Sequence, residues 1–134
     1  MSRRLLALVI LALVAVFAIA ACDSSTSSDA PGAYTVSADK AVEMINAGDR
    51  TVIDVRTPEE FAAGHVVGAL NYDVNGAAFS DQIAELDPEV PVLVYCRSGN
   101  RSAQAASQME GIGIGDIADA GGLADLAAAG APVE

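Results

Sequence analysis

Residues 92–101 read Val-Leu-Val-Tyr-Cys-Arg-Ser-Gly-Asn-Arg and form the most informative stretch of the chain. Its first four residues predict a buried strand that runs straight into Cys96. A short polar loop with one glycine follows, and then Arg101 and a run of Ser, Ala and Gln typical of a helix. Where a strand meets the start of a helix, unpaired backbone N–H groups and the helix dipole favour a thiolate, lowering its pKa from about 8.5 to about 3.5–7.5. The stretch therefore predicts a nucleophilic cysteine.

Strands and helices alternate on both sides of this stretch. Strands are expected at residues 34–36, 51–55, 70–72, 92–95 and 114–118. Helices are expected after Ser37, after Thr57 (whose capping box Glu60 closes), over residues 79–86 and 102–109, and from Gly121-Gly122 to residue 129. Because the central strands are continuous apolar runs, the pattern predicts an α/β fold, with a central parallel sheet covered by helices on both faces. Arg56 and Cys96 each follow a strand, so we expect both at the carboxyl edge, where active sites form in such sheets.

The N-terminus has the pattern of an export signal. Arg3 and Arg4 precede 17 uncharged apolar residues, 5–21, a run that is short for a membrane-spanning helix. The run ends in Ile-Ala-Ala-Cys, which resembles a bacterial lipobox. We therefore expect residues 1–21 to be a lipoprotein signal peptide and Cys22 to be lipidated, with a plain secretory signal or an uncleaved anchor as alternatives. Residues 22–33 hold the lipidation site and a flexible Ser/Asp/Pro/Gly linker, which leaves residues 34–134 as one domain.

The charge and the cysteine content of the chain indicate which kinds of molecule it binds. Without Arg3 and Arg4 the chain has five basic and 18 acidic residues, a formal charge of −13, so nucleic acid and anionic lipid headgroups are poor partners. Arg97 and Arg101 are two of the five remaining cations, and their place beside the cysteine loop indicates a small anionic substrate. If Cys22 is lipidated, Cys96 has no partner for an internal disulfide. We expect a protein anchored by its lipid to the outer face of the cell membrane.

Three motifs resemble those of rhodanese-like domains. Residues 54–71 (DVRTPEEFAAGHVVGALN) look like the first signature of the family, and residues 96–102 (CRSGNRS) look like its active-site loop. Gly121-Gly122-Leu123 and residues 128–134 (AAGAPVE) match its C-terminal end. The motifs come in the family's order and span the chain from about residue 34 to the C-terminus. One departure is Leu126, where many members have a tryptophan, and we expect it to affect packing of the last helix more than chemistry.

The resemblance implies a sulfurtransferase with a rhodanese-like fold. Cys96 would attack the sulfane sulfur of a donor such as thiosulfate and hold it as a persulfide, until a thiophilic acceptor, cyanide or a thiol, removes it. Backbone N–H groups of the loop can form a nest for the persulfide, and Arg97 and Arg101 can bind the oxygens of the donor. The residues expected to bind substrate are Arg97, Ser98, Gly99, Asn100, Arg101 and Arg56.

Several of these polar residues also have a structural interpretation. Arg97 can be a solvated loop residue, and Arg101 is expected to support the loop through a carboxylate, with substrate contact secondary. Asp54 is expected to support the site, and a structural ion pair with Arg56 is at least as plausible as a direct role for either residue. His65, the only histidine, is expected in a packing turn rather than as a general base.

Rival functions differ in what they require of the loop. Cysteine-dependent phosphatases place five residues between cysteine and arginine, whereas four separate Cys96 from Arg101, a cradle suited to a single sulfur atom. A thioredoxin-like oxidoreductase needs a Cys-x-x-Cys pair, which the chain lacks. A non-catalytic, membrane-tethered binding or redox-sensing module stays open. We expect no metal site, no organic cofactor and a monomer.

Overall fold

The computed structural model describes residues 32–134. The expected signal peptide, the lipidation site at Cys22 and most of the linker lie outside these residues. The described chain forms a five-stranded sheet in the order β1-β5-β4-β2-β3, in which every pairing is parallel. The strands are β1 (Gly32–Thr35), β2 (Thr51–Asp54), β3 (Leu70–Asn71), β4 (Val92–Cys96) and β5 (Asp116–Gly122). The expected α/β fold with a parallel sheet is confirmed.

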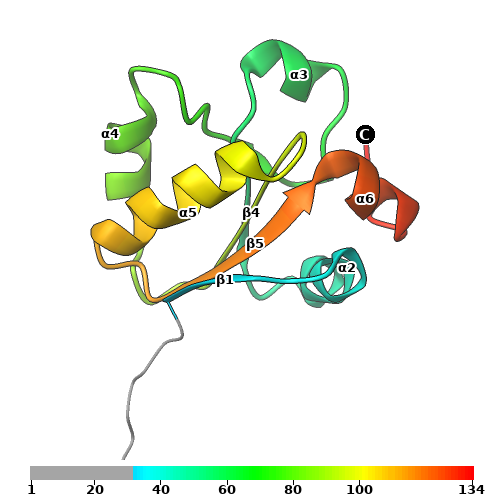
Figure 1. The fold of residues 1–134 in the computed structure, drawn as a ribbon, viewed down its shortest axis with the longest axis horizontal. Helices are drawn as coiled ribbons and strands as arrows, with labels where there is room; N and C mark the ends of the chain where they lie inside the picture. The colour runs from blue at the N-terminus through cyan, green and yellow to red at the C-terminus, as the bar shows by residue number, and fades with distance from the viewer. Residues whose placement is uncertain (1–31) are drawn as a thin grey trace, which may run out of the picture.

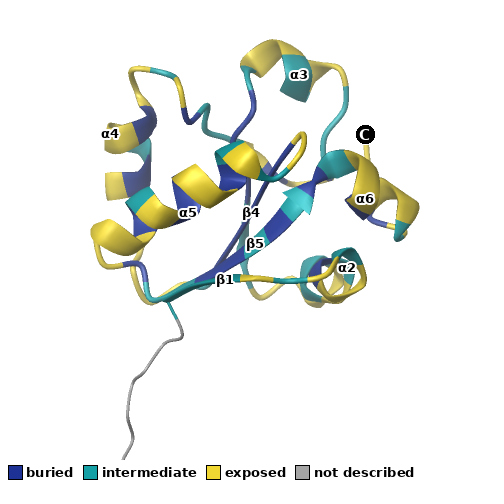
Figure 2. Cartoon of the chain, viewed as in Figure 1, coloured by how far each residue is buried: buried dark blue, intermediate teal, exposed yellow. Residues whose placement is uncertain are grey.

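Helices cover both faces of this sheet (Figure 1). They are α2 (Ala38–Ala47), α3 (Pro58–Ala62), α4 (Phe79–Ala84), α5 (Asn100–Gly111) and α6 (Leu123–Ala128). Helices α4 and α5 pack on one face around Val94 and Ile117, while α2, α3 and α6 pack on the other around Leu93 and Tyr95. Alternate side chains of β4 therefore pack in the two cores. All five residues of β4 are buried, as expected for a strand covered on both faces (Figure 2). Leu126 is fully buried in the second core, which makes it a packing residue.

Helix boundaries follow the capping residues in the sequence. The Ser37 side chain accepts a hydrogen bond from the Lys40 N–H, and Gly48 closes the same helix in the left-handed conformation. At α3, the Thr57 hydroxyl accepts from the Glu60 N–H while the Glu60 carboxylate accepts from the Thr57 N–H. This is the expected capping box, and it fixes where the chain turns after β2.

Several boundaries differ from the sequence-based expectation. β1 begins at Gly32, so two residues expected in the linker pair with β5. β5 covers residues 116–122 rather than 114–118, because the chain first closes the end of α5 with a hydrogen bond from the Ile114 N–H to the Met109 carbonyl. Gly121 and Gly122 end β5, and Gly122 is also the N-cap of α6, so the expected helix start is confirmed at Gly122. The pairing of β5 with β4 shifts by one residue before Gly122. α5 begins at Asn100, two residues early.

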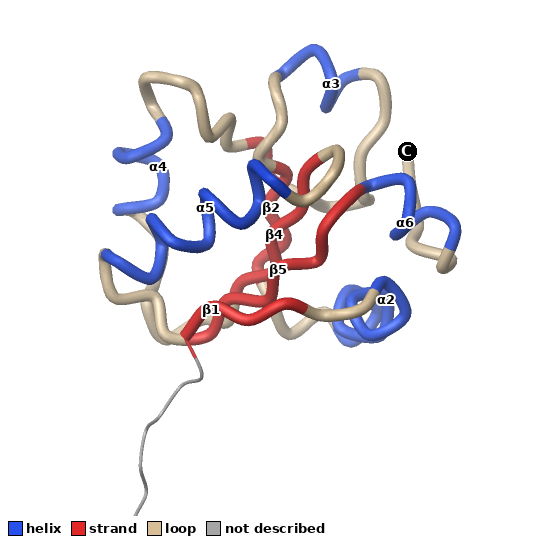
Figure 3. The backbone as a smooth tube through the Cα atoms, viewed as in Figure 1, coloured by secondary structure: helices blue, strands red, loops and turns tan. Residues whose placement is uncertain are grey.

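At one edge of the sheet, β4 leads into a loop and the neighbouring strand β5 leads directly into α6 (Figure 3). No helix within residues 32–134 is both long and apolar enough to cross a membrane. Over the same residues, no group of three or more His, Cys, Asp or Glu side chains is placed to hold a metal ion. Binding sites of parallel α/β sheets form beyond the carboxyl ends of the strands, which is the edge that holds the end of β4.

Candidate active site

Cys96 is the last residue of β4, and its side chain is 0% exposed. The neighbouring strand β2 lies parallel to β4 with Asp54 opposite Tyr95, and the Val55 N–H donates to the Tyr95 carbonyl at 3.0 Å. Arg56 leaves β2 just beyond this point. The prediction that Arg56 and Cys96 lie at the same carboxyl edge of the sheet is confirmed.

The loop after Cys96 curls back over the sulfur. The Gly99 N–H donates to Cys96 Sγ at 2.9 Å, and Gly99 caps α5 with a φ of 97°, a conformation that favours glycine. The base of the loop lies against the end of β5. A Cβ atom on Gly122 would stand 2.6 Å from the Arg97 carbonyl oxygen, so only glycine allows this approach. The loop is thus shaped by two glycines, one inside it and one in the strand beside it.

Ser102 is a site residue that the sequence analysis did not single out. Its side chain is fully buried, and its Oγ lies 3.6 Å from Cys96 Sγ, at hydrogen-bond distance for a thiol donor. The hydroxyl donates to the Gly99 carbonyl at 3.0 Å, so it also braces the loop. The signal available in the sequence was its place in the first turn of α5, on the side of the helix that faces the sheet.

The pKa of the Cys96 thiol lies below the ordinary value of 9.0. Burial is the largest single influence and raises the pKa, because a thiolate loses solvation there. Hydrogen bonds from the Ser102 hydroxyl and from the backbone N–H groups of Ser102, Ser98 and Gly99 act in the opposite direction, and together they outweigh burial. The loop therefore favours the thiolate, the reactive form of cysteine.

Arg101 is held by a carboxylate, as the sequence analysis expected. Its two terminal nitrogens donate to Glu60 Oε2 at 2.7 Å and Oε1 at 2.9 Å, a bidentate ion pair that ties the first turn of α5 to α3. The Arg101 hydrogen bonds lower the pKa of Glu60 to about 2. Glu60 thus closes a capping box and also anchors the cysteine loop, a second role that we did not expect.

Asp54 and Arg56 form a buried ion pair beneath the site. Arg56 Nη2 donates to Asp54 Oδ2 at 2.6 Å and to the Gly64 carbonyl at 2.7 Å, and Arg56 Nε donates to both Asp54 oxygens. Asn71 adds hydrogen bonds to the Asp54 and Arg56 carbonyls. These contacts give both residues the structural role that was one of the two interpretations of the sequence, and Arg56 also lines the cavity described below.

Arg97 is the one lysine or arginine of residues 32–134 that makes no ion pair. The other four cations each contact a carboxylate: Lys40 with Glu43, Arg50 with Asp49 and Asp116, Arg56 with Asp54, and Arg101 with Glu60. Arg97 is exposed at the tip of the cysteine loop, as are Ser98 and Asn100. Its charge is therefore available to an anion that approaches Cys96.

His65 lies in a packing turn, as expected. Its ring stacks on Phe61 with centroids 3.6 Å apart, Nδ1 lies 2.9 Å from the Phe61 carbonyl, and Nε2 lies 3.5 Å from a Glu134 carboxylate oxygen. Both ring nitrogens thus face partners other than Cys96.

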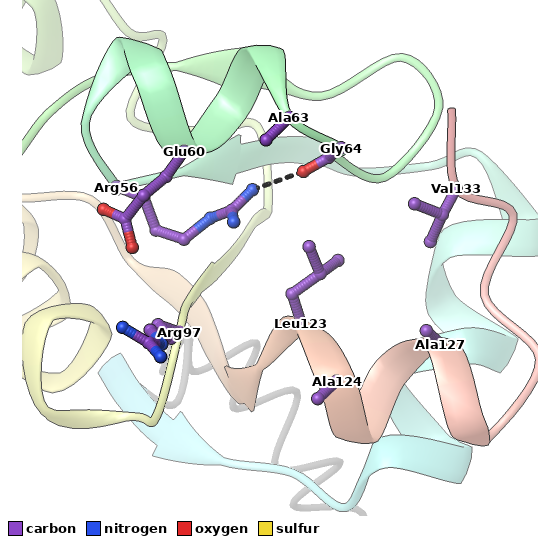
Figure 4. A pocket seen from close by; sticks show the side chains of 9 residues that line it. All are labelled: Arg56, Glu60, Ala63, Gly64, Arg97, Leu123, Ala124, Ala127 and Val133. Carbon is purple, nitrogen blue, oxygen red and sulfur yellow. Dashed lines mark hydrogen bonds between the residues drawn. The ribbon is translucent and has the colours of Figure 1, made fainter.

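A cavity of about 380 Å³ opens beside the loop, between α3 and α6 (Figure 4). Its wall on the α6 side is apolar, with Leu123 pointing toward α3 and Val133 closing the far end. Arg97 stands at one end, next in the chain to Cys96. The remaining lining residues are Arg56, Glu60, Ala63, Gly64, Ala124 and Ala127.

The fold and the site define an α/β protein with an activated cysteine in a tight loop at the carboxyl edge of a parallel sheet. The model of the rhodanese-like domain family matches residues 37–126, and the chain belongs to this family.

Curated relatives and solved structures agree with this assignment. Thiosulfate sulfurtransferase GlpE of Pseudomonas putida is 36% identical over 96 residues, which cover 72% of this chain and 86% of the relative. The crystal structure of a rhodanese-related protein from Thermoplasma volcanium superposes with a TM-score of 0.65 at 27% identity, covering 75% of this chain and 96% of the other. A structure described as a rhodanese with anions from E. coli gives a TM-score of 0.55 at 33% identity, covering 63% and 96%.

Proposed function

We propose that this protein is a sulfurtransferase that moves the sulfane sulfur of a donor such as thiosulfate to a thiophilic acceptor through a persulfide on Cys96. The observation that carries the proposal is the hydrogen-bonded Cys96 sulfur, which accepts from the Gly99 N–H at 2.9 Å and has a lowered pKa. The similarity to curated thiosulfate sulfurtransferases supports the same reaction class.

In the first half-reaction the Cys96 thiolate attacks the outer sulfur of thiosulfate. A bond forms between Sγ and that sulfur, the S–S bond of the donor breaks, and its electron pair leaves on sulfite. No proton or external oxidant is required, since one thiolate and one dianion give a persulfide anion and a second dianion. Arg97 makes no ion pair within residues 32–134, so its guanidinium is available to bind the donor's oxygens.

In the second half-reaction an acceptor nucleophile, cyanide or a thiol, attacks the outer sulfur of the persulfide. The persulfide S–S bond breaks and its electron pair returns to Cys96 as thiolate. The backbone N–H groups that lower the pKa of the thiol also stabilise negative charge on this leaving group. The loop therefore serves both halves of the reaction with the same hydrogen bonds.

Intact mass of the purified protein before and after thiosulfate tests this proposal. We expect a gain of one sulfur atom that cyanide removes and that Cys96→Ser abolishes. This variant retains Cys22, so it also controls for a persulfide at the other cysteine. If Cys96 reacts with an alkylating reagent yet gains no sulfur from thiosulfate, the donor assignment is wrong, and the non-catalytic binding or redox-sensing module becomes the better function.

We also propose that the protein is exported and anchored to the outer face of the cell membrane by a lipid on Cys22. The charged start, the apolar run and the lipobox-like end of residues 1–22 support this proposal, as does the linker that follows. Intact mass of the protein extracted from membranes of cells expressing wild type and Cys22→Ser tests it. A chain that begins at Cys22 and carries acyl groups is expected for the wild type and not for the variant, whereas wild-type protein without acyl groups would exclude the lipid anchor at Cys22.

A further inference from the structure

Helix α3 carries Glu60, the partner of Arg101, but its own packing is too small to fix its position. The helix has five residues, and none of them is buried. Its N-terminal end is closed by the capping box at Thr57. Because a helix this short depends on tertiary contacts, the place of Glu60 depends on how the chain on either side of α3 is attached to the sheet.

The chain that leaves α3 is attached to the sheet by hydrogen bonds to two buried side chains. Arg56 Nη2 donates to the Gly64 carbonyl at 2.7 Å (Figure 4), and the Tyr95 hydroxyl accepts from the Val66 N–H at 3.0 Å. Val66 and Tyr95 are both 0% exposed. On either side of Val66, residues 65 and 67 bond instead to the main chain of residues 132 and 134. Tyr95 is therefore the residue that joins this segment to β4, the strand of Cys96.

The Tyr95 hydroxyl has a second partner, on β2. Asp54 lies opposite Tyr95 in the pairing of β2 with β4, and its carboxylate is a hydrogen-bond partner of the hydroxyl. Burial, the largest cause, and the charge of Asp54 raise the pKa of Tyr95, so the hydroxyl stays protonated. It can thus accept from Val66 and donate to Asp54 at the same time. One buried oxygen joins β2, β4 and the segment after α3.

These contacts enclose the cysteine loop, because Tyr95 directly precedes Cys96. The loop runs from Cys96 to Arg101, and Arg101 pairs with Glu60 in α3. The chain that leaves α3 then bonds back to Tyr95 through the Val66 N–H. We call the Arg101–Glu60 pair and the Tyr95–Val66 hydrogen bond the α3 network. It holds both ends of the loop to the same short helix.

We propose that Tyr95 is a positioning residue of the sulfur-transfer reaction, whose hydroxyl completes the α3 network and so holds the cysteine loop where its backbone N–H groups reach the sulfur. The ring of Tyr95 lies in the core, so the residue acts through α3 and Glu60 rather than by touching the donor. The inference rests on the proposed function, because it assigns a further residue to that reaction.

Tyr95→Phe tests this assignment, because it keeps the aromatic ring in the core and removes only the hydroxyl. The readout is the midpoint of the pH profile of Cys96 alkylation by iodoacetamide, with the reaction at Cys22 subtracted. At a pH where the thiol form predominates, we expect roughly three- to tenfold less thiolate than in wild type, as for the loss of one hydrogen bond. Persulfide formation from thiosulfate should slow by the same factor. A wild-type profile in a folded Tyr95→Phe protein would overturn the assignment.

Glu60→Gln, alone and combined with Tyr95→Phe, separates positioning from a general loss of stability. Both substitutions open the α3 network, so the double variant should have about as much thiolate as the more affected single variant. Effects that multiply would show that Tyr95 acts independently of Glu60, which would also overturn the proposal.

Tyr34→Phe is the matched control. The Tyr34 hydroxyl also bonds a carboxylate, Asp116 Oδ1 at 2.9 Å, but Asp116 lies at the amino end of β5, away from the loop. This variant should keep the wild-type alkylation profile. A shift as large as that of Tyr95→Phe would mean that the profile reports general destabilisation, and the assignment would be wrong.

Hydrogen exchange at the Val66 amide decides the question if Tyr95→Phe does not fold. This amide should be protected in wild type and exchange faster in Glu60→Gln, because opening the α3 network at Arg101 loosens its other end. Equal exchange rates in the two proteins would refute the proposal. Alkylation and exchange do not depend on sulfur transfer. If wild type takes no sulfur from thiosulfate, the proposed function is wrong, whereas these two measurements still decide whether Tyr95 positions the loop.

Discussion

Replacing Ser102 by alanine should raise the pKa of the Cys96 thiol and slow alkylation of Cys96 about tenfold at a pH where the thiol form predominates. The Ser102 hydroxyl lies 3.6 Å from Sγ, and its side-chain hydrogen bond is the largest of the influences that lower this pKa. A hydrogen bond to a charged group contributes about 1.5–3 kcal/mol, and this one is long and shared with the Gly99 carbonyl, so we take the lower end. Because about 1.4 kcal/mol corresponds to a factor of ten in an equilibrium constant, the loss leaves about tenfold less thiolate.

The loop itself should survive this substitution. The Gly99 carbonyl also accepts a hydrogen bond from the Ala103 N–H at 3.1 Å, so Ser102→Ala does not leave it unpaired. Unfolding curves of the variant and the wild type, measured side by side, check this point. The effect on the thiol can then be assigned to the missing hydroxyl rather than to a collapsed loop.

The assay is the rate of alkylation by iodoacetamide as a function of pH, with Cys96→Ser measured in parallel to subtract reaction at Cys22. Ser98→Ala is the control, because Ser98 influences the thiol through its backbone N–H, which alanine keeps. We expect the profile of Ser98→Ala to match wild type and that of Ser102→Ala to move to higher pH. A Ser102→Ala profile that coincides with wild type, in a folded protein, would refute the argument that this hydroxyl stabilises the thiolate.

Three further predictions concern the residues that hold and serve the loop. Glu60→Gln keeps a capping-box side chain but removes the ion pair, and should cost about 1 kcal/mol of unfolding free energy at neutral pH after solvent screening. Because the pKa of Glu60 is lowered from 4.5 to about 2, the difference in unfolding free energy between wild type and Glu60→Gln should shrink as pH falls from 4.5 to 2. A difference that stays constant in urea titrations across that range would contradict this prediction. Gly122→Ala places a Cβ against the Arg97 carbonyl, which should lower the free energy of unfolding by about 1–3 kcal/mol and slow persulfide formation. Gly111→Ala is the control, because Gly111 lies in α5 with open space around it and the substitution should not destabilise the protein. Equal stability of the two variants in thermal unfolding would be evidence against the close contact. Arg97→Gln should lower kcat/KM for thiosulfate roughly tenfold with unchanged unfolding, since the residue is exposed and makes no ion pair within residues 32–134. Steady-state kinetics showing full activity would remove Arg97 from the site.

Local patterns accounted for the parts of the structure that depend on neighbours in sequence. The apolar run of β4 and the polar loop after it placed Cys96 at the end of a buried strand, and Ser37 and Thr57 located two helix starts. Each of these features is fixed by residues within one or two turns. Such features can be predicted from the sequence because the residues that cause them are close together in the chain.

The features that were missed depend on contacts between distant segments. The pair between Glu60 and Arg101 joins residues 41 apart, and the capping box offered a sufficient local reason for Glu60. The Gly121-Gly122 pair marks the start of α6, as expected, but the sequence did not show that the same pair also ends β5, where Gly122 lies against the Arg97 carbonyl. Ser102 was expected only as the first residue of a helix. Its hydroxyl lies near the Cys96 sulfur because the loop folds back over that sulfur.

The contact between Gly122 and the Arg97 carbonyl also limits how this fold can change its reaction. The loop is fixed at its base by that contact and at its far end by the pair of Arg101 with Glu60. One inserted residue, which would give the five-residue spacing of a phosphatase loop, would lie between these two fixed ends, where Arg97, Ser98 and Asn100 are exposed. The two contacts therefore confine any lengthening of the loop to its exposed tip. The size of the cradle around the sulfur depends on a glycine and a glutamate that lie outside the loop itself.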